Sequence, residues 1–512
     1  MGIEIEVENM SKKLLLGMLL CICYLSAACG KNNDVTENEN RKLKWLLPAE
    51  TENIDKTEEE LVERELKKFF ADRNIEVDLC FIDKDTYGEQ ITKVLQTDQE
   101  WDLMFLDQKL NQVMRSETRK FFAPITDQLN AENHQLYSAI PEYAWDVMTV
   151  NKEIYAIPNR HLWAGQSGFY VRTDDLKEYG RGLNPKEASS FEQIGSFLEK
   201  MTYEEGFIGT YIPQNRWEQE LLSYGFYFSG DLENLGVIAG GPEGIVVQNM
   251  FETAEFEEYC NRMRSWYLDG YIREDSAVRD ANATVISQDK KDGLFVLEPV
   301  ENIAPGVEKL VEKAYGEEDS FVALPTSEIV ISPNKVAEYS TAFSADSEQL
   351  SEAVAVAEEV YHNPELYNLI LYGIEGKHYE KVNDRQIKKI PDSGYGANDS
   401  GAVESHALGN QYLSYVMEDE AIDKWERLAE WEKEAKIPAT MGFFFRTNNV
   451  SDEIRNVSAI LELELRLLET GSVDVDSFLP EFQGKLREAG AYRIMTEYQN
   501  QLTRWINNKS EY

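Results

Sequence analysis

The residues with the most promising chemistry are two short runs that mix polar and aromatic side chains. They read Asn159-Arg160-His161-Leu162-Trp163 and Gln214-Asn215-Arg216-Trp217. Flat aromatic faces pack against the C–H groups of a sugar ring, and the planar guanidinium of Arg offers several donors to hydroxyls. The runs therefore indicate a site for a polar, ring-shaped solute, with candidate contacts at Asn159, Arg160, His161, Trp163, Arg216 and Trp217. The alternative is that the Trp side chains pack in a core and the Arg side chains pair with acidic residues.

A second set of candidates follows short apolar segments that read as strands. Glu50 follows the segment 43–47, Asp107 and Gln108 follow 103–106, and Glu298 follows 294–297. Ligands of parallel sheets bind beyond the carboxyl ends of the strands, so these polar groups could accept hydrogen bonds from hydroxyls. The competing interpretation is that they cap the helices that follow.

Covalent and metal chemistry is poorly supported by the sequence. The five His residues show no zinc spacing, and the run Gly165-Gln166-Ser167-Gly168 is not a nucleophile elbow. The Gly-rich segment 240–244 lacks the Lys-Ser/Thr of a phosphate loop, and Asp474 and Asp476 are followed by no Gly, as a calcium loop would need. Among 93 acidic residues, some pair will resemble a glycosidase dyad by chance. We therefore predict no catalytic residue, no metal site and no cofactor.

The elements that must position these residues alternate between strand and helix. The segments 43–47, 75–81 and 103–106 read as strands, separated by an apolar stripe of helical spacing after Thr57 and by a helix over 87–96. This order predicts a parallel sheet covered by helices. A second α/β region is expected over roughly 160–340, and the chain is mostly helical past 350, with Gly471 as a plausible C-cap.

The first thirty residues read as an export signal rather than as part of the fold. Lys12 and Lys13 precede an uncharged run over 14–28, which ends in small residues before Cys29. The run is too short for a bilayer span of about 20 residues and suits a signal peptide. It resembles a bacterial lipobox, with Cys29 as the lipidated residue and Met10 as the preferred start. A plain secretory signal or an uncleaved anchor are the alternatives.

Composition and charge narrow the possible partners. The 512 residues are 42% hydrophobic and 28% charged, as in ordinary globular proteins, and their formal net charge is −42. A chain this acidic repels phosphate backbones, so nucleic-acid binding is disfavoured. Three of the five cysteines lie in the first 29 residues, which leaves no disulfide framework.

Several stretches resemble the extracellular solute-binding proteins of ABC importers. They are Trp101-Asp102-Leu103-Met104-Phe105-Leu106, Asn151-Lys152-Glu153-Ile154-Tyr155-Ala156-Ile157-Pro158 and the segment from Gly168 through Tyr170 to Leu176. Four further segments are similar to the LipO-like lipoprotein branch, which carries a C-terminal domain of unknown function. They are Asn363-Pro364-Glu365-Leu366-Tyr367-Asn368, the stretch 372–379 that holds Tyr372, Glu375 and His378, and the segments 408–411 and 442–445.

The resemblance implies an α/β fold of two lobes, of the periplasmic-binding-protein type II, with a hinge and a cleft between the lobes. The implied domains are a signal peptide over 1–28, a flexible tether over 29–41, lobes over 42–157 and 158–340, a return to the first lobe over 341–410, and a helical region over 411–512 that packs on the lobes. Tyr170, Tyr372, Glu375 and His378 join the candidate ligand contacts.

The function implied is capture of a carbohydrate, an oligosaccharide above all, and delivery to an ABC permease by a monomer tied through lipid to the outer face of a Gram-positive cytoplasmic membrane. Closure of the lobes, not covalent chemistry, would do the work. Three alternatives remain open at this point: a binding protein for peptides or another polar solute, a surface glycoside hydrolase, and a sensor that reports its ligand to a membrane kinase.

Overall fold

Two separate hydrophobic cores organise the chain in the computed structural model, which describes residues 42–97, 99–115, 117–130, 135–204, 237–241, 244–278, 297–300, 302–315 and 320–509. We use "first lobe" for the described residues within 42–165 and 329–441, which surround one core. We use "second lobe" for the described residues within 166–328 and 442–509, which surround the other. The expected signal peptide, the tether and Cys29 lie outside the described residues.

The first lobe is built on a five-stranded sheet in the order β2-β1-β3-β14-β6. Its strands are β1 (Leu43–Ala49), β2 (Val77–Asp83), β3 (Leu103–Leu106), β6 (Ala156–Pro158) and β14 (Ser340–Phe343). β1 runs parallel to β2 and β3, and β14 runs antiparallel to β3 and β6. Because β3 is fully buried, its short apolar run needs no alternation. β14 is also fully buried, and its Ser340 and Thr341 hydroxyls donate to the side-chain oxygens of Asn111 and Asn159.

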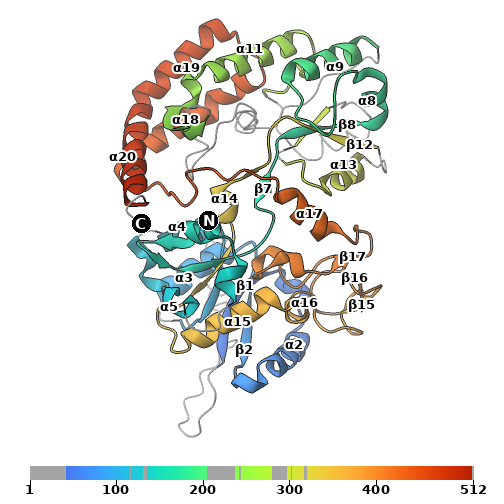
Figure 1. Ribbon diagram of the computed structural model, residues 1–512, viewed down its shortest axis with the longest axis vertical. Helices are drawn as coiled ribbons and strands as arrows, with labels where there is room; N and C mark the ends of the chain where they lie inside the picture. Colours follow the sequence, from blue (N-terminus) through green and yellow to red (C-terminus); the bar gives the residue numbers. More distant parts are fainter. Residues whose placement is uncertain are drawn as a thin grey trace, which may run out of the picture. The chain divides into compact units, whose positions relative to one another are not determined.

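Helices cover this sheet as the strand–helix order predicts (Figure 1). α2 (Lys56–Phe69) and α3 (Tyr87–Gln96) pack on β2, while α15 (Leu350–His362) packs on β14 and on α16 (Pro364–Tyr372). The buried Tyr87 hydroxyl donates to the carbonyls of Leu46 at 3.1 Å and Phe105 at 2.9 Å, which fixes α3 against two strands. The predicted helix over 87–96 and strand over 103–106 are confirmed.

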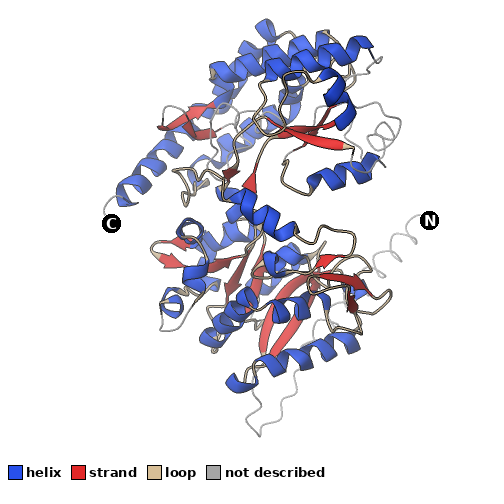
Figure 2. Cartoon of the chain, turned by 45° about the vertical axis from the view of Figure 1, so that its right-hand side comes forward, coloured by secondary structure: helices blue, strands red, loops and turns tan. Residues whose placement is uncertain are grey.

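The second lobe holds a smaller, antiparallel sheet in the order β11-β8-β12, visible in Figure 2. Its strands are β8 (Gly168–Arg172), β11 (Leu297–Val300) and β12 (Phe321–Pro325). α8 (Thr173–Tyr179), α9 (Phe191–Glu204), α11 (Ala254–Leu268) and α13 (Val307–Tyr315) accompany it. Three long helices from the end of the chain complete the core: α18 (Ser451–Glu469), α19 (Val475–Ala489) and α20 (Ala491–Lys509).

The C-terminal region divides between the two lobes. α17 (Lys424–Glu432) and the segment before it lie against the first core, whereas α18 to α20 share the second core with α9 and α11. α18 also contacts α11 directly, and Gly471, at φ +67°, ends α18 where an added Cβ would lie 2.1 Å from the Met263 carbonyl oxygen. Gly471 therefore allows the close approach of two helices that are distant in sequence.

The chain passes between the lobes at three places that lie side by side. β7 (Ala164–Gly165) pairs antiparallel with β13 (Val330–Ile331). The Ile331 amide donates to the Lys436 carbonyl at 2.9 Å, and the Lys436 amide donates to the Ile329 carbonyl at 2.8 Å. The segment after Lys436 then enters the second core at Phe443. Backbone hydrogen bonds thus join all three crossings into one connection.

The remaining elements are short or peripheral. The helices are α4 (Gln108–Arg115), α5 (Thr126–Leu129), α6 (Leu136–Ala139), α7 (Glu142–Met148) and α14 (Pro333–Val336). The strands are β4 (Thr149–Val150), β5 (Glu153–Ile154), β9 (Val237–Gly241), β10 (Gly244–Asn249), β15 (Tyr379–Lys381), β16 (Gln386–Lys389) and β17 (Val416–Met417). The 3-10 helices cover Thr51–Asn53, Ala71–Arg73, Glu117–Phe121, Met250–Glu252, Ser405–Ala407, Gln411–Leu413 and Asn448–Val450. In the described part of the chain, no helix combines the length and the apolar character that crossing a membrane requires.

Candidate functional site

A pocket of about 360 Å³ lies between the second-lobe sheet and α17. Gln166, Tyr170, Pro185, Ile303, Pro305, Glu308, Phe321, Val322, Ala323 and Pro325 line it from the second lobe, and Arg427 and Trp431 line it from α17. Its volume falls in the range of small-molecule sites. Since α17 packs on the first core, both lobes contribute walls, and Gln166 comes directly after the crossing strand β7.

Helical spacing on α17 explains how Arg427 and Trp431 reach the same pocket. They are four residues apart, so they share one face of the helix. Leu428, on the adjacent face, is buried in the molecule and holds the helix down. Trp431 is only partly buried and touches the first core, which leaves part of its indole surface for the pocket. One helix thus presents an aromatic plane beside a guanidinium.

The opposite wall comes from the second-lobe sheet and from α13. Tyr170 of β8, which is 1% exposed, and Phe321 of β12, which is 7% exposed, form an apolar floor under the pocket, and Glu308 of α13 supplies a carboxylate. The Glu308 carboxylate accepts from the Gly306 amide at 2.7 Å and from the Arg427 guanidinium at 3.4 Å. Burial raises the pKa of the Tyr170 hydroxyl, so Tyr170 stays neutral. The Arg427–Glu308 contact is long and partly exposed, and a ligand hydroxyl could replace it at low cost.

This combination of groups suits recognition without covalent chemistry. Aromatic faces, a guanidinium, a carboxylate and an amide converge on one space, which is the mixture that binds polar rings. Within the described residues, no three His, Cys, Asp or Glu side chains are grouped as metal ligands would be.

The predicted binding run 159–163 lies at the entry to β7 and is largely buried. Trp163 has no exposed surface, and its indole N–H donates to the Asn159 carbonyl at 3.2 Å. Asn159 is also buried, donating to the His406 carbonyl at 3.0 Å and accepting from the Thr341 hydroxyl at 2.9 Å. These contacts are those of packing residues, the alternative raised from the sequence. A ligand contact by this run stays a prediction.

Arg160 pairs with a buried acid rather than with solvent. Its guanidinium bonds the carboxylate of Glu432, which is 5% exposed, and stacks on Trp163 and Tyr412 with 4.5 Å to each ring centre. His161 is 5% exposed and lies 4.9 Å from the Tyr339 ring centre. Burial lowers the pKa of His161 well below its usual value, so its imidazole is neutral.

The candidates at the strand ends of the first lobe have local partners. Glu50 bonds Lys84 at 2.5 Å and accepts from the Asn53 amide at 2.9 Å, and the Lys84 bond lowers the pKa of Glu50. Asp107 accepts from the Leu110 amide at 2.8 Å at the start of α4, so the helix-capping interpretation is confirmed for this residue. Gln108 is the exposed first residue of α4.

The stretch 372–379 folds back on α2 at a distance from the pocket. His378 has no exposed surface, accepts from the Ile374 amide at 2.8 Å and bonds the Glu58 carboxylate at 3.0 Å. Burial lowers the pKa of His378 and raises that of Tyr372 to about 12. Tyr372 bonds Ser414 at 3.1 Å, and Glu375 pairs with Lys381 at 3.2 Å. These residues hold the first lobe together.

Of the sequence candidates, Tyr170 alone is found among the described pocket residues. Arg216 and Trp217 lie outside the described residues. Glu298 lies on β11 opposite Tyr170 in register, and its side chain is not among those described. Neither Arg427 nor Trp431 is among the ligand contacts predicted from the sequence, although their spacing of four residues on an amphipathic helix was the available signal.

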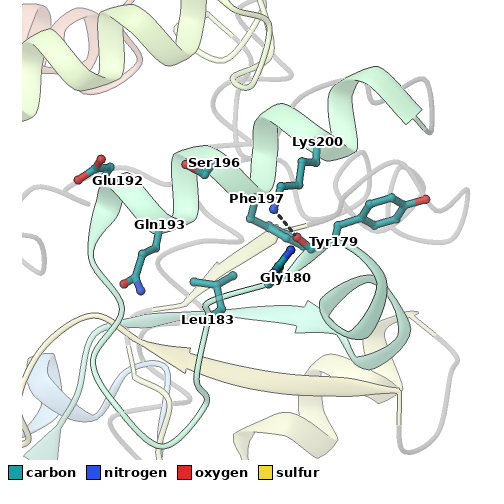
Figure 3. A pocket seen from close by; sticks show the side chains of 9 residues that line it. Tyr179, Gly180, Leu183, Glu192, Gln193, Ser196, Phe197 and Lys200 are labelled. Atoms are coloured by element: carbon teal, nitrogen blue, oxygen red, sulfur yellow. Dashed lines mark hydrogen bonds between the residues drawn. The ribbon is translucent and has the colours of Figure 1, made fainter.

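A second hollow of about 290 Å³ lies on the second lobe between α8 and α9, and Figure 3 shows its lining side chains. Two of its polar side chains bond backbone carbonyls. Lys200 donates to the Tyr179 carbonyl at 3.1 Å, and Gln193 donates to the Gly182 carbonyl at 2.9 Å. The hollow draws on one lobe and lies away from the crossings, so the pocket at α17 is the stronger candidate.

Comparison with known proteins agrees with this geometry. The chain is 24% identical over 440 residues to a carbohydrate ABC transporter substrate-binding protein of Streptococcus pneumoniae, which covers 85% of each chain. The crystal structure of the N-glycan transport solute binding protein NgtS from Streptococcus pneumoniae matches with a TM-score of 0.70 and 21% identity, over 92% of this chain and 100% of that one. The fold is that of two-lobed solute-binding proteins.

Two further matches support this assignment. A solute binding protein of Bifidobacterium longum infantis, described as HMO binding and ABC-transporter associated, matches with a TM-score of 0.62 and 14% identity, over 90% of this chain and 99% of that one. Residues 439–507 match DUF3502, a domain of unknown function. The predicted resemblance to ABC-importer binding proteins with such a C-terminal domain is confirmed, and so is the two-lobed α/β fold. In this chain the matched domain supplies α18 to α20, and hence part of the second core.

Proposed function

We propose that this protein captures an oligosaccharide in the pocket at α17 and delivers it to an ABC importer. The observation that carries the proposal is the pocket itself, where both lobes meet beside the chain crossings with Trp431, Tyr170 and Phe321 as aromatic walls. A ligand held there contacts both lobes at once, so it stabilises their closed arrangement over the open one. The permease would then bind the closed, ligand-loaded conformation.

The relatives support a carbohydrate rather than another polar solute. Solved structures similar to this chain are described in complex with Man1GlcNAc, Man5GlcNAc and kestose. Their names describe binding and transport, with no enzyme among them, which argues for release of an intact ligand. The acidic charge of −42 further disfavours anionic ligands and favours neutral glycans.

The place of action that we propose is the outer face of the cytoplasmic membrane. The lipobox-like end at Cys29 would carry the lipid, and the polar segment 31–41 would serve as a tether. Tethering favours a monomer in a single-membrane, Gram-positive envelope, where a free carrier would diffuse away. Replacing Cys29 with Ser should release the protein from membranes on fractionation, and continued retention would refute the anchor.

The test of the ligand is a thermal-shift panel of neutral glycans and peptides, with Man5GlcNAc and kestose among the glycans. A binder melts at higher temperature as ligand concentration rises, and chromatography should recover the ligand uncut. Cleaved glycan would favour the glycoside hydrolase, and shifts with peptides alone would favour a peptide carrier. Loss of glycan import on gene deletion separates a carrier from a sensor.

The test of the site is Trp431→Ala, with Trp425→Ala on the same helix as the matched control. Trp425 donates to the Ser414 carbonyl at 2.7 Å and lies outside the pocket lining. We expect Trp431→Ala to raise the Kd for the selected glycan about tenfold or more, because a stacking surface is lost. Trp425→Ala should leave the Kd unchanged. Equal effects of the two variants would remove the pocket from consideration.

A further inference from the structure

The end of α17 carries a buried carboxylate that the ligand pocket does not use. Glu432 is the last residue of α17, follows Trp431 directly and is 5% exposed. One of its carboxylate oxygens accepts from the backbone amides of Trp163 at 2.9 Å and Ala164 at 3.1 Å. The other accepts from the Arg160 guanidinium and from the Tyr412 hydroxyl, the latter at 3.2 Å.

These bonds connect two parts of the molecule that are far apart in sequence. Ala164 begins β7, the first of the three crossings, and Gln166 of the pocket follows two residues later. α17 carries Arg427 and Trp431, the pocket residues on the side of the first lobe. A single carboxylate therefore bonds the ligand-facing helix to the start of the first crossing strand. Figure 1 shows α17 beside β7 in this arrangement.

We infer that Glu432 is a positioning residue: by accepting the amides of Trp163 and Ala164 it fixes α17, and with it Arg427 and Trp431, in the orientation that ligand binding and lobe closure require. The inference rests on the function proposed above, since it assigns a role within the same site. It adds that binding strength depends on a residue that touches no ligand.

Arg160 acts in this scheme as the counter-ion of Glu432. Burial alone would lower the pKa of Arg160, but the bond to Glu432 and its negative charge, together with Tyr412 and Tyr361, offset this, so the pKa is raised and the guanidinium is charged. Removing one member of a buried ion pair leaves an unpaired charge, whereas removing both charges together is tolerated far better. The amide contacts, unlike the ion pair, need only an acceptor oxygen, which a glutamine side chain also has.

Three variants of the full chain separate the amide contacts of Glu432 from its ion pair with Arg160. Glu432→Ala removes the amide acceptor. The double variant Arg160→Gln/Glu432→Gln keeps an acceptor and leaves no buried charge. Glu434→Ala changes an exposed residue just beyond the same helix and is the control. The measurements are hydrogen exchange of the peptides covering 160–166 and α17, the Kd for Man5GlcNAc, and the melting temperature.

For Glu432→Ala we expect faster hydrogen exchange in both peptides and a Kd for Man5GlcNAc raised about tenfold or more, because a buried hydrogen-bond acceptor is lost. The double variant should bind within about threefold of the wild type. A purely structural role predicts that affinity follows melting temperature in every variant. The positioning role predicts that affinity follows the amide contacts, even where the double variant melts lower.

The inference is overturned if Glu432→Ala binds as tightly as the wild type, or if the double variant binds as weakly as Glu432→Ala. Should Glu432→Ala fail to fold, the Kd of the double variant is compared with that of Glu434→Ala. A Kd of the double variant more than about threefold higher would then overturn the inference. Failure of the wild type to bind any glycan would count against the proposed function instead. The hydrogen-exchange data need no ligand, so they would then test the positioning role of Glu432 alone. Unchanged exchange in Glu432→Ala would reject that role.

Discussion

The two lobes differ in how many charged side chains they bury. In the first lobe, Asp102, His378, Lys389 and Glu432 are all buried beside apolar residues, each with hydrogen-bonding partners. The second lobe also buries uncharged polar side chains, among them Asn249, Ser276 and Thr470. Its apolar core is rich in aromatic groups, such as Phe251 and Phe482, whose ring centres lie 5.4 Å apart. Among its described residues, Glu312 and Glu469 are the buried acids.

This difference indicates which interactions fix the conformation of each lobe. Buried polar groups must keep their partners, so the network of the first lobe allows few alternative arrangements around the crossings. An apolar core is held by volume and shape and tolerates rearrangement better. The second core is also assembled from segments far apart in sequence, because α18 to α20 close over α9 and α11. It therefore depends on the C-terminal domain being present.

The largest expected effect is that of Trp163→Ala in the first lobe. The substitution would leave a cavity and remove the contacts of Trp163 with the Asn159 carbonyl, the Arg160 guanidinium and the Tyr143 ring. We expect a loss of about 4–5 kcal/mol of unfolding free energy without ligand, measured by denaturant titration. The sequence indicates a ligand contact for Trp163, with core packing as the alternative. An unchanged unliganded stability would favour the ligand contact.

In the second lobe, Phe482→Ala should cost about 3–4 kcal/mol, since a fully buried ring is removed from contact with Phe251. Leu463→Ala on α18 is the control, because Leu463 is 77% exposed and should change stability by less than about 0.5 kcal/mol. Thermal denaturation measures both. A small effect of Phe482→Ala would mean that the C-terminal helices are dispensable for the second core.

A pH effect of intermediate size should belong to the first lobe. Burial lowers the pKa of Lys389 from 10.5 to about 8, while its ammonium donates to the Tyr395 carbonyl at 2.7 Å. Between pH 8 and 10.5 the unfolded chain holds a proton that the native protein has released, so the contribution of Lys389 to stability rises with pH through that window. The slope is at most about 1.4 kcal/mol per pH unit.

Lys389→Met should abolish this slope. The measurement is the free energy of unfolding of wild type and variant at pH 7 to 10, where the difference between the two curves isolates the one group. Parallel curves across the window would show that Lys389 is not buried as the structure has it.

The smallest effect should come from the surface of the second lobe. Arg487 pairs with Glu252 at 2.7 Å, but it is 41% exposed, and Tyr492 also donates to Glu252 at 2.9 Å. Arg487→Ala should change the unfolding free energy by about 0.5 kcal/mol or less, and less still at high salt. A loss of several kcal/mol would mean that polar contacts hold this lobe as they hold the first.

Local structure was the part of the fold most readily predicted. The strand at 43–47, the helix at 87–96 and the strand at 103–106 follow from apolar spacing within each segment, and the structure has them as β1, α3 and β3. Helical spacing also predicts an apolar stripe of Ile454, Val457, Leu461, Leu465 and Leu468; it lies on α18, where all but Ile454 are buried. The candidate site was less predictable. Trp163 and Trp431 are both flanked by polar residues in the sequence, and they differ in the residues from distant parts of the chain that pack against them.

The amino-acid sequence by itself determined the order of strands and helices, the acidic balance, the lack of metal spacing and the resemblance to solute-binding proteins, since each depends on residues near one another in the chain or on composition. Tertiary structure alone decided which tryptophan is covered and which faces a pocket. The Trp163 side chain is enclosed in the first core, where Glu432, more than 250 residues away, binds its backbone amide. Trp431 lines the pocket while it also packs against the first core. Burial is a property of contacts between distant segments, and periodicity within one segment carries no information about them.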